Sequence, residues 1–232
     1  MVVHTFHLAK PGFLRTSTAL LRPPTSASVE GLHHAECMMP MQLGAAIVSP
    51  GRWQVRRLAM FAAWEHETAI DEFLGNTTLG KTLAKGWHVR LEFLRRWGHV
   101  SEFDGLPAKA GETDLDAPVV AVTLARLALL QVPRFIRCGK PVERLVRDHP
   151  STTLALAATR PMRTISTFSI WQTAREMKDM VHGHSKVAEP DRHSTAMVER
   201  KRKDFHLEFT TLRFNCISEH GAWEGRTGIV PT

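Results

Sequence analysis

Phe61-Ala-Ala-Trp64 and Phe168-Ser-Ile-Trp171 are two copies of one Phe-x-x-Trp pattern, and the prediction of the fold starts from them. The first copy ends the near-continuous apolar run LAMFAAW, which is typical of a central strand buried on both faces, and the second copy ends the strand pattern RTISTFSIW. Each copy is followed by an amphipathic helical pattern. A second pair of landmarks, Glu102-Phe103-Asp104-Gly105 and Ala222-Trp223-Glu224-Gly225, ends the two halves of the chain. The sequence therefore contains an internal duplication.

The first half predicts the order strand, helix, strand, strand, helix, strand. Pro23-Pro24 stops the first helix, and Pro40 is expected to break the second strand. In the last strand, Val89 alternates with the polar residues His88 and Arg90. The predicted elements are a strand at 3–8, a helix at 13–21, an irregular strand at 32–44, a strand at 52–64, a helix at 66–84 and a strand at 88–94.

The second half repeats this order. Residues 106–117 are polar and acidic and contain Gly and Pro, so they read as a linker between a first ferredoxin-like half at 1–105 and a second at 118–232. The landmarks lie farther apart in the second half, and we place the extra residues in the segment HGHSKVAEPDRHS at 182–194.

The duplicated unit predicts an α+β fold. A βαββαβ unit forms a four-stranded antiparallel sheet with helices on one face, and its bare face must be buried. Two tandem ferredoxin-like units bury both bare faces by closing into a dimeric α/β-barrel-type fold, whose interior could hold a ligand. Because the repeat supplies both sheets, we expect a monomer with internal pseudo-dimer symmetry or a homodimer.

Composition excludes several classes of protein. The 232 residues carry a formal net charge of +7, but no nucleic-acid-binding motif organises that charge, so we expect no nucleic-acid partner. Cys37, Cys138 and Cys216 are odd in number and far apart, which suits a reducing compartment rather than a disulfide framework. We find no signal peptide and no run of 18 apolar residues, which predicts a cytoplasmic protein without a membrane span.

Two motifs are interpreted as coincidences. Residues 75–82, GNTTLGKT, match the Walker A pattern, but a phosphate loop requires a preceding strand and a helix that begins at the lysine. Here the preceding residues are helical. His33, His34 and Cys37 suggest zinc, but a structural site needs four ligands, and no second pair is visible.

The same landmarks resemble the spheroidene monooxygenase-like family. FAAWEHETAIDEFLGNTTLGKTLAKGWHVRLEFLRRWG in the first half, and TFSIWQTAREMKDMV, HSTAMVERKRKDF and EHGAWEGR in the second, are similar to that family in order and spacing from about residue 3 to 225. The segment at 22–43 departs from the family pattern, because an aromatic residue is absent and His33, His34 and Cys37 are present.

The resemblance implies a haem-dependent oxidoreductase of carotenoid biosynthesis, a monooxygenase that acts on an apolar, carotenoid-like substrate. His193 matches a histidine that opens the last helix of the second half, and it is the first choice as axial ligand of the haem iron. His184 is the alternative. Arg57 and Arg96 are candidates for binding haem propionates, and Trp64 and Trp171 are candidates for the walls of a substrate pocket.

A second hypothesis is kept beside the first. An α/β barrel without catalytic activity, or without a cofactor, could bind a small hydrophobic ligand, since one fold supports many functions. A Gly-x-Gly-x-x-Gly motif for a flavin or nicotinamide is absent from the sequence, so a monooxygenase would need a separate electron-transfer partner.

Overall fold

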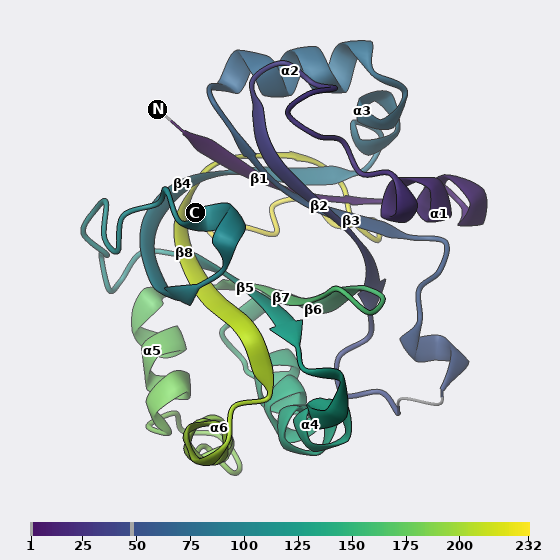
Figure 1. Ribbon diagram of the computed structural model, residues 1–232. Coiled ribbons are helices and arrows are strands. Elements are labelled where there is room, and N and C mark those ends of the chain that lie inside the picture. The colour runs from purple at the N-terminus through teal and green to yellow at the C-terminus, as the bar shows by residue number, and fades with distance from the viewer. Residues whose placement is uncertain (1, 47–48) are drawn as a thin grey trace.

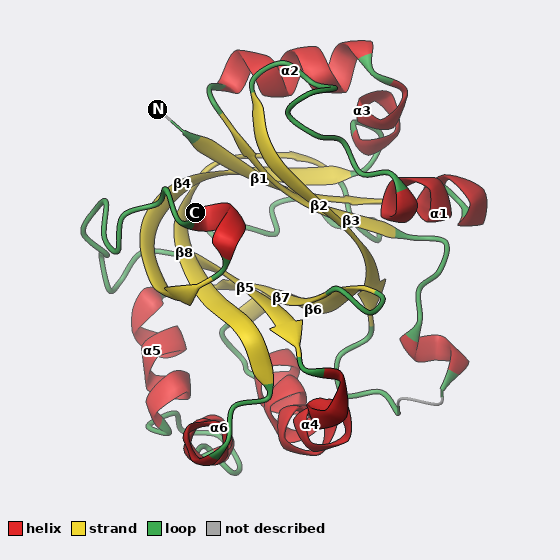
Figure 2. Cartoon of the chain, viewed as in Figure 1, coloured by secondary structure: helices red, strands yellow, loops and turns green. Residues whose placement is uncertain are grey.

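The computed structural model describes residues 2–46 and 49–232, and in it eight strands form one closed barrel. Helices of the first half cover one side of the barrel and helices of the second half cover the opposite side (Figures 1 and 2). The first half contains β1 (Val3–Ala9), α1 (Phe13–Leu21), β2 (Leu32–Met41), β3 (Leu58–Trp64), α2 (Glu67–Asn76), α3 (Thr78–Leu83) and β4 (Trp87–His99). The second contains β5 (Val119–Leu127), α4 (Val132–Asp148), β6 (Thr152–Arg160), β7 (Thr164–Trp171), α5 (Ala174–His182), α6 (Arg192–Arg202) and β8 (His206–Gly221). Short 3-10 turns are η1 (Pro50–Arg52), η2 (Ser101–Phe103) and η3 (Leu129–Gln131).

The strands follow the order β1-β3-β2-β6-β7-β5-β8-β4 around the barrel. Each half therefore contributes one antiparallel four-stranded sheet, and equivalent edge strands of the two sheets pair with each other. The two seams differ in length: β4 pairs with β8 over twelve residue pairs, whereas β2 pairs with β6 over three. The expected α+β fold of two ferredoxin-like units closed into a barrel is confirmed. Residues 106–117 join β4 to β5 without forming a helix or strand.

Side chains alternate between the barrel interior and the helices, as the pleat of a strand requires. The interior is filled rather than hollow along its middle. Phe6 of β1 and Phe168 of β7, on opposite walls, stack with their ring centroids 3.8 Å apart, and both side chains are buried. The expectation of a ligand space in the barrel centre is not met, because these aromatic side chains meet there.

One local expectation is corrected. Strand β2 continues through Pro40, which pairs with Ala158 of β6 in the middle of the short seam, so the proline does not break it. The Walker-like residues lie in α2 and α3, with Thr77 accepting a hydrogen bond from the Gly80 amide between them. A Cβ atom at Gly80 would lie 1.8 Å from the Phe73 carbonyl oxygen, so this glycine is required by the close approach of α3 to α2. The interpretation of this motif as a coincidence agrees with its helical context.

The boundaries of α5 follow from local chemistry. Thr173 caps its first turn by accepting the Glu176 amide at 3.2 Å, and Gly183 ends it in the left-handed conformation with φ of 79°. The last carbonyls of α5 face the start of α6, where His193 lies. This junction positions the histidine that the sequence singled out.

Candidate functional site

The helix-facing side of the second sheet has a strip of small side chains that has no counterpart in the first sheet. Trp64 pairs with Val3 in the first half, as Trp171 pairs with Val119 in the second, so the two sheets are in equivalent register. By that register, Thr167 occupies the position that buried Met60 occupies in the first half.

Thr167 is exposed although β7 is a central strand and α4, α5 and α6 lie on this side of the sheet (Figure 1). Its neighbour across the strands is Thr123 of β5, and the two hydroxyl groups are hydrogen-bonded to each other. In the first half the corresponding pair is Met60 and His7, both buried. The second half therefore leaves space between sheet and helices that the first half fills with side chains.

Two hollows flank α4 on this side of the molecule. The first, of about 330 Å³, lies between α4 and the ends of β6 and β7, and its walls are mainly apolar. The second is a groove of about 970 Å³ between α4 and α6, where arginines and acids alternate. The first is lined in part by Leu127, Val132, Phe135, Ile136, Gly139 and Ile165, and the second in part by Arg134, Arg137, Cys138, Arg192, Ala196 and Glu199.

Gly139 is an unusual residue for the interior of α4, because glycine weakens a helix by about 1 kcal/mol relative to alanine. It lines the apolar cavity, and a Cβ atom built on it would have only the Phe135 ring within 4 Å, at 3.9 Å. The absent side chain therefore enlarges the cavity.

His193 lies in the first turn of α6, on the helix side that faces the sheet. Ala196 on this side is buried, and the guanidinium of Arg200, seven positions after His193, lies 3.8 Å from the centroid of the Phe209 ring of β8. The Nδ1 atom of His193 is 3.0 Å from the carbonyl oxygen of Val181 in α5. Because a carbonyl only accepts, this contact assigns the ring proton to Nδ1 and leaves a lone pair on Nε2.

Burial lowers the pKa of His193 below its ordinary value, although the bond to the Val181 carbonyl acts in the opposite direction. A neutral imidazole whose Nδ1–H is held by a backbone carbonyl is the form in which histidine usually binds a metal. His193 therefore fits the chemistry of an axial ligand. It does not itself line either hollow, but Arg192, Thr195 and Ala196 of the same helix line the groove.

The other residues selected from sequence are not gathered around His193. His184 is exposed in the loop after α5, where its ring stacks on that of His182 at 6.0 Å. Arg57 forms an ion pair with Glu224 at 2.8 Å near the C-terminus, and Arg96 donates to the Gly98 carbonyl at 3.1 Å on β4. The two arginines are thus engaged in separate places.

Trp64 and Trp171 face the helices and not the barrel interior. Trp64 donates its indole N–H to Thr5 at 2.8 Å and packs against Phe73 of α2, while Trp171 donates to Ser169 at 2.9 Å. Both rings are buried and hydrogen-bonded within the sheet–helix layers. The structure gives both tryptophans a packing role and places neither on the wall of the two hollows described above.

A polar cluster lies inside the barrel near the end of β5. Glu36 of β2, only 1% exposed, accepts a hydrogen bond from Thr164 at 2.9 Å and lies 3.4 Å from the guanidinium of Arg126. Arg126 also binds Glu102 of η2 at 2.6 Å, and His34 lies 3.7 Å from Glu36. We call these five residues the Glu36 cluster.

The Glu36 cluster keeps its carboxylates ionised. Burial alone would raise the pKa of Glu36, but His34, Arg126 and Thr164 together lower it below the ordinary value. Ligand atoms of His34, Glu36 and Glu102 lie within 4.8 Å of one another, a spacing that would suit a metal ion. Arg126 already supplies positive charge to both carboxylates. Cys37 points to the opposite face of β2, so the residues His33, His34 and Cys37 do not form a zinc site.

Three further histidines are buried with both ring nitrogens unpaired among the described residues: His4, His7 and His88. His4 points into the barrel, where its ring lies 5.0 Å from that of Phe214. His7 and His88 face outward and stack at 4.9 Å, and His88 stacks in turn on exposed His220 at 4.7 Å. Such groups raise the free energy of the folded state because they give up hydration without gaining a partner.

Mild acid is expected to destabilise the protein because these histidines must stay neutral. The pKa of His4 is lowered from 6.5 to about 3, mainly by burial and secondly by the charge of His33. The pKa of His88 is lowered to about 4, again mainly by burial and secondly by the charge of His220. The unfolded chain thus binds more protons than the folded chain between about pH 6.5 and 3, so stability falls as pH falls through that range.

Urea unfolding of the wild type and of His4→Leu at several pH values from 7.5 to 4 measures this effect. We expect the midpoint to fall steadily below about pH 6.5 in the wild type and less steeply in the variant. A wild-type midpoint that stays constant between pH 7 and pH 5 would contradict the prediction.

Comparison with known proteins places the fold. No family model matches the chain, and no curated protein matches it. An aldoxime dehydratase structure covers 100% of this chain and 88% of its own, with 9% identity and a TM-score of 0.55. A second aldoxime dehydratase, in complex with butyraldoxime, covers 98% and 84% with 8% identity and a TM-score of 0.54. A monooxygenase-like protein from Listeria innocua matches with 9% identity over 94% of this chain and 96% of its own, but at a TM-score of 0.29.

The protein therefore belongs to the class of ferredoxin-like α/β barrels, and it shares this fold with aldoxime dehydratase. The sequence identities are so low that the likeness establishes the fold alone. The particular resemblance to spheroidene monooxygenase stays a prediction, since no family model supports it. Among the described residues, no helix is long and apolar enough to cross a bilayer.

Proposed function

We propose that the protein is a haem-dependent oxidoreductase of the monooxygenase type that acts on an apolar, carotenoid-like substrate. The observation that carries the proposal is the unfilled strip at Thr123 and Thr167, next to an apolar cavity and on the same side of the sheet as the helix that holds His193 (Figure 1). A large flat apolar group is the kind of ligand that fits between a sheet and its helices without a change of fold.

The chain's own residues would do three things for such a group. His193 would hold the haem iron through Nε2, with Nδ1–H held by Val181. Arg137 and Arg192, which line the groove, are better placed than Arg57 and Arg96 to bind carboxylates of the group. Bound haem would supply the activation of dioxygen.

The apolar walls of the cavity would exclude water from the substrate. Electrons would come from a separate donor, because the sequence lacks a nucleotide-binding motif for a flavin or nicotinamide. A cytoplasmic location belongs to the same proposal.

Titration of the purified protein with haem, followed by the Soret band, tests the proposal. We expect a shifted Soret band with the wild type. Gly139→Leu, whose side chain would enter the cavity assigned to the substrate, should bind an added carotenoid at least tenfold more weakly. The matched control is Gly75→Leu, which changes a helical glycine in α2 where an added Cβ atom would meet no heavy atom within 4 Å. A wild type that gives no Soret shift would overturn the haem proposal.

The second candidate function is binding of a small hydrophobic ligand without a cofactor. It is favoured by one observation: the residues that line the apolar cavity include no histidine among the part of the chain that the structure describes. Displacement of an apolar fluorescent dye from the wild type, reduced in Gly139→Leu and accompanied by no response to haem, is the result that would select this function.

A further inference from the structure

The excess positive charge of this protein lies in one segment. Residues 132–204 contain 15 Lys and Arg against 8 Asp and Glu, whereas the rest of the chain contains 15 of each. The whole formal charge of +7 therefore belongs to α4, α5, α6 and the strands and loops between them. Charge concentrated on one side of a protein attracts an anionic partner to that side.

Three large apolar side chains are exposed within this basic segment or a few residues beyond its ends. Leu130 in η3 is 93% exposed, Met162 in the turn between β6 and β7 is 89% exposed, and Leu207 at the start of β8 is 75% exposed. Met162 has a φ of 59°, a strained conformation for methionine that holds its side chain at the tip of the turn. We call these three residues the apolar rim.

The apolar rim belongs to one region of the molecule. Leu127, three residues before Leu130, pairs with His206, the neighbour of Leu207. Leu127 and Met162 line the same apolar cavity, so Met162 lies beside Leu130 and Leu207. Arg134 donates to the carbonyl of Lys203 at 2.7 Å, which brings the start of α4 against the end of α6.

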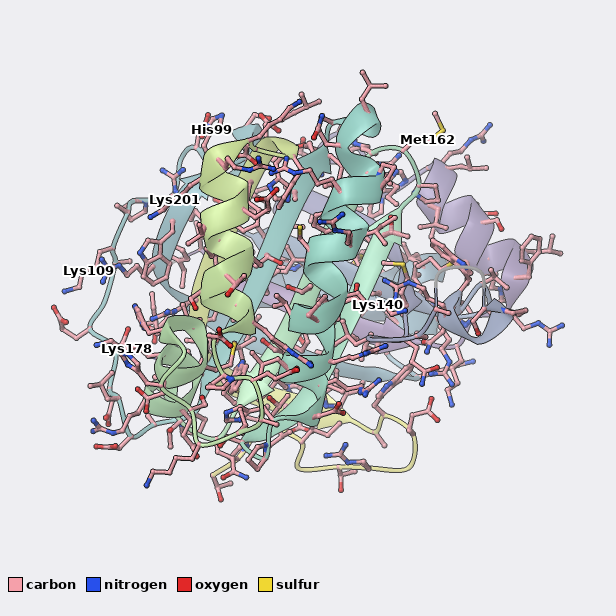
Figure 3. All side chains as sticks on the ribbon, turned by 90° about the horizontal axis from the view of Figure 1, so that it is seen from below. His99, Lys109, Lys140, Met162, Lys178 and Lys201 are labelled. Carbon is pink, nitrogen blue, oxygen red and sulfur yellow. The ribbon has the colours of Figure 1, made fainter. Side chains whose placement is uncertain are left out.

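Basic side chains surround the rim. Lys201, Arg202 and Lys203 are exposed at the end of α6, and Arg163 follows Met162 in its turn with 54% of its side chain exposed. In Figure 3, Lys201 and Met162 both lie in the upper part of the view, on opposite sides of α6 and α4.

We propose that this end of the molecule docks on an anionic phospholipid surface, with the apolar rim inserted among the lipid headgroups and the surrounding Lys and Arg bound to their phosphates. Exposed apolar side chains enclosed by basic ones are the pattern that binds a membrane interface without spanning it. A nucleic acid would use the charge but would not need three exposed aliphatic side chains, so the lipid surface accounts for both observations.

Docking in this orientation would also bring the apolar cavity close to the lipid. Met162 is at once a member of the rim and part of the cavity wall, so the docked surface would place the cavity beside the lipid. An apolar ligand could then move between bilayer and cavity without crossing water. Docking itself requires no bound haem, and its test is independent of the proposed function.

Sedimentation of the full chain with lipid vesicles tests the docking. We expect binding to vesicles of phosphatidylcholine with phosphatidylglycerol, little binding to phosphatidylcholine alone, and release by high salt. The triple variant Leu130→Ser, Met162→Ser, Leu207→Ser should bind at least tenfold more weakly, as should Lys201→Glu with Lys203→Glu. All five positions are exposed, so circular dichroism should be unchanged.

Matched controls come from the first half of the chain. Leu14 and Leu21 of α1 are 78% and 79% exposed, and Lys81 and Lys85 are exposed as well. The same changes, Leu→Ser and Lys→Glu, should leave vesicle binding unaltered at these sites. The proposal is overturned if anionic vesicles do not bind the wild type, if the control variants lose as much binding, or if a DNA duplex binds tightly while vesicles do not.

Discussion

Replacing Arg126 with methionine is expected to lower the free energy of unfolding by about 3–5 kcal/mol, because it leaves buried carboxylate charge without its partner. Glu36 is 1% exposed and the side chain of Arg126 is 13% exposed, so water cannot replace the lost guanidinium. Thr164 and Arg160, the latter 3.8 Å from Glu36, remain as partial compensation. Urea unfolding at pH 7.5 measures the change.

The control for this variant is Arg163→Met. Arg163 lies 3.8 Å from Glu102, but its side chain is 54% exposed, so its loss should cost less than about 1 kcal/mol. The double variant Glu36→Gln, Arg126→Met should recover much of the lost stability, because it removes the buried charge as well as its partner. Equal losses for Arg126→Met and Arg163→Met would contradict this account of the Glu36 cluster.

The sign of the pH dependence follows from the same contacts. The pKa of folded Glu36 is below its ordinary value of 4.5, so this group stabilises the fold above that pH, and the contribution is lost as pH falls through the lower folded pKa. Without Arg126 the burial effect dominates and the pKa of Glu36 should rise. Arg126→Met should therefore lose less stability, relative to the wild type, at pH 4 than at pH 7.5.

His193→Ala is expected to abolish the Soret shift on addition of haem and to leave the far-ultraviolet circular dichroism unchanged. The variant removes the imidazole nitrogen that the proposed function assigns to the iron, while alanine is a good helix former in the first turn of α6. Added imidazole should restore part of the absorption change, which a merely structural role for His193 would not allow.

His184→Ala is the matched control for this variant. His184 lies in the exposed loop before α6, and its replacement should leave haem binding unaltered if His193 is the ligand. Binding that survives in His193→Ala and is lost in His184→Ala would transfer the role to the alternative. Binding unaffected by either change would remove both histidines from the proposal.

The fold was predictable because it depends on patterns that repeat. Phe61 to Trp64 and Phe168 to Trp171 lie at the ends of β3 and β7, where the apolar run LAMFAAW and the pattern RTISTFSIW already indicated strands. The bounds of α1 match the expected helix at 13–21. The prediction that Pro40 breaks the second strand was wrong. Proline usually ends a strand because it has no N–H to donate, but this loss matters little where β2 approaches the end of its pairing.

The candidate site could be predicted less well from the sequence than the fold, because it depends on pairs of residues that are distant in sequence. Glu36 and Arg126 meet only because the barrel closes, and neither has a local sequence signal. The strip at Thr167 does have a signal in the sequence, because alignment of the duplicated halves on the two tryptophans puts Met60 against Thr167. Gly139 inside an otherwise amphipathic helix was a second such signal.

The unequal seams of the barrel affect how it can open. Twelve residue pairs join β4 to β8, but only three join β2 to β6. Separation of the short seam breaks few hydrogen bonds and leaves both four-stranded sheets intact, so the amide protons of Met39 and Met41 should exchange with solvent sooner than those in the middle of the long seam. The molecule is in this respect two sheets joined along one edge, and partial unfolding would expose the filled interior first on the side of β2 and β6.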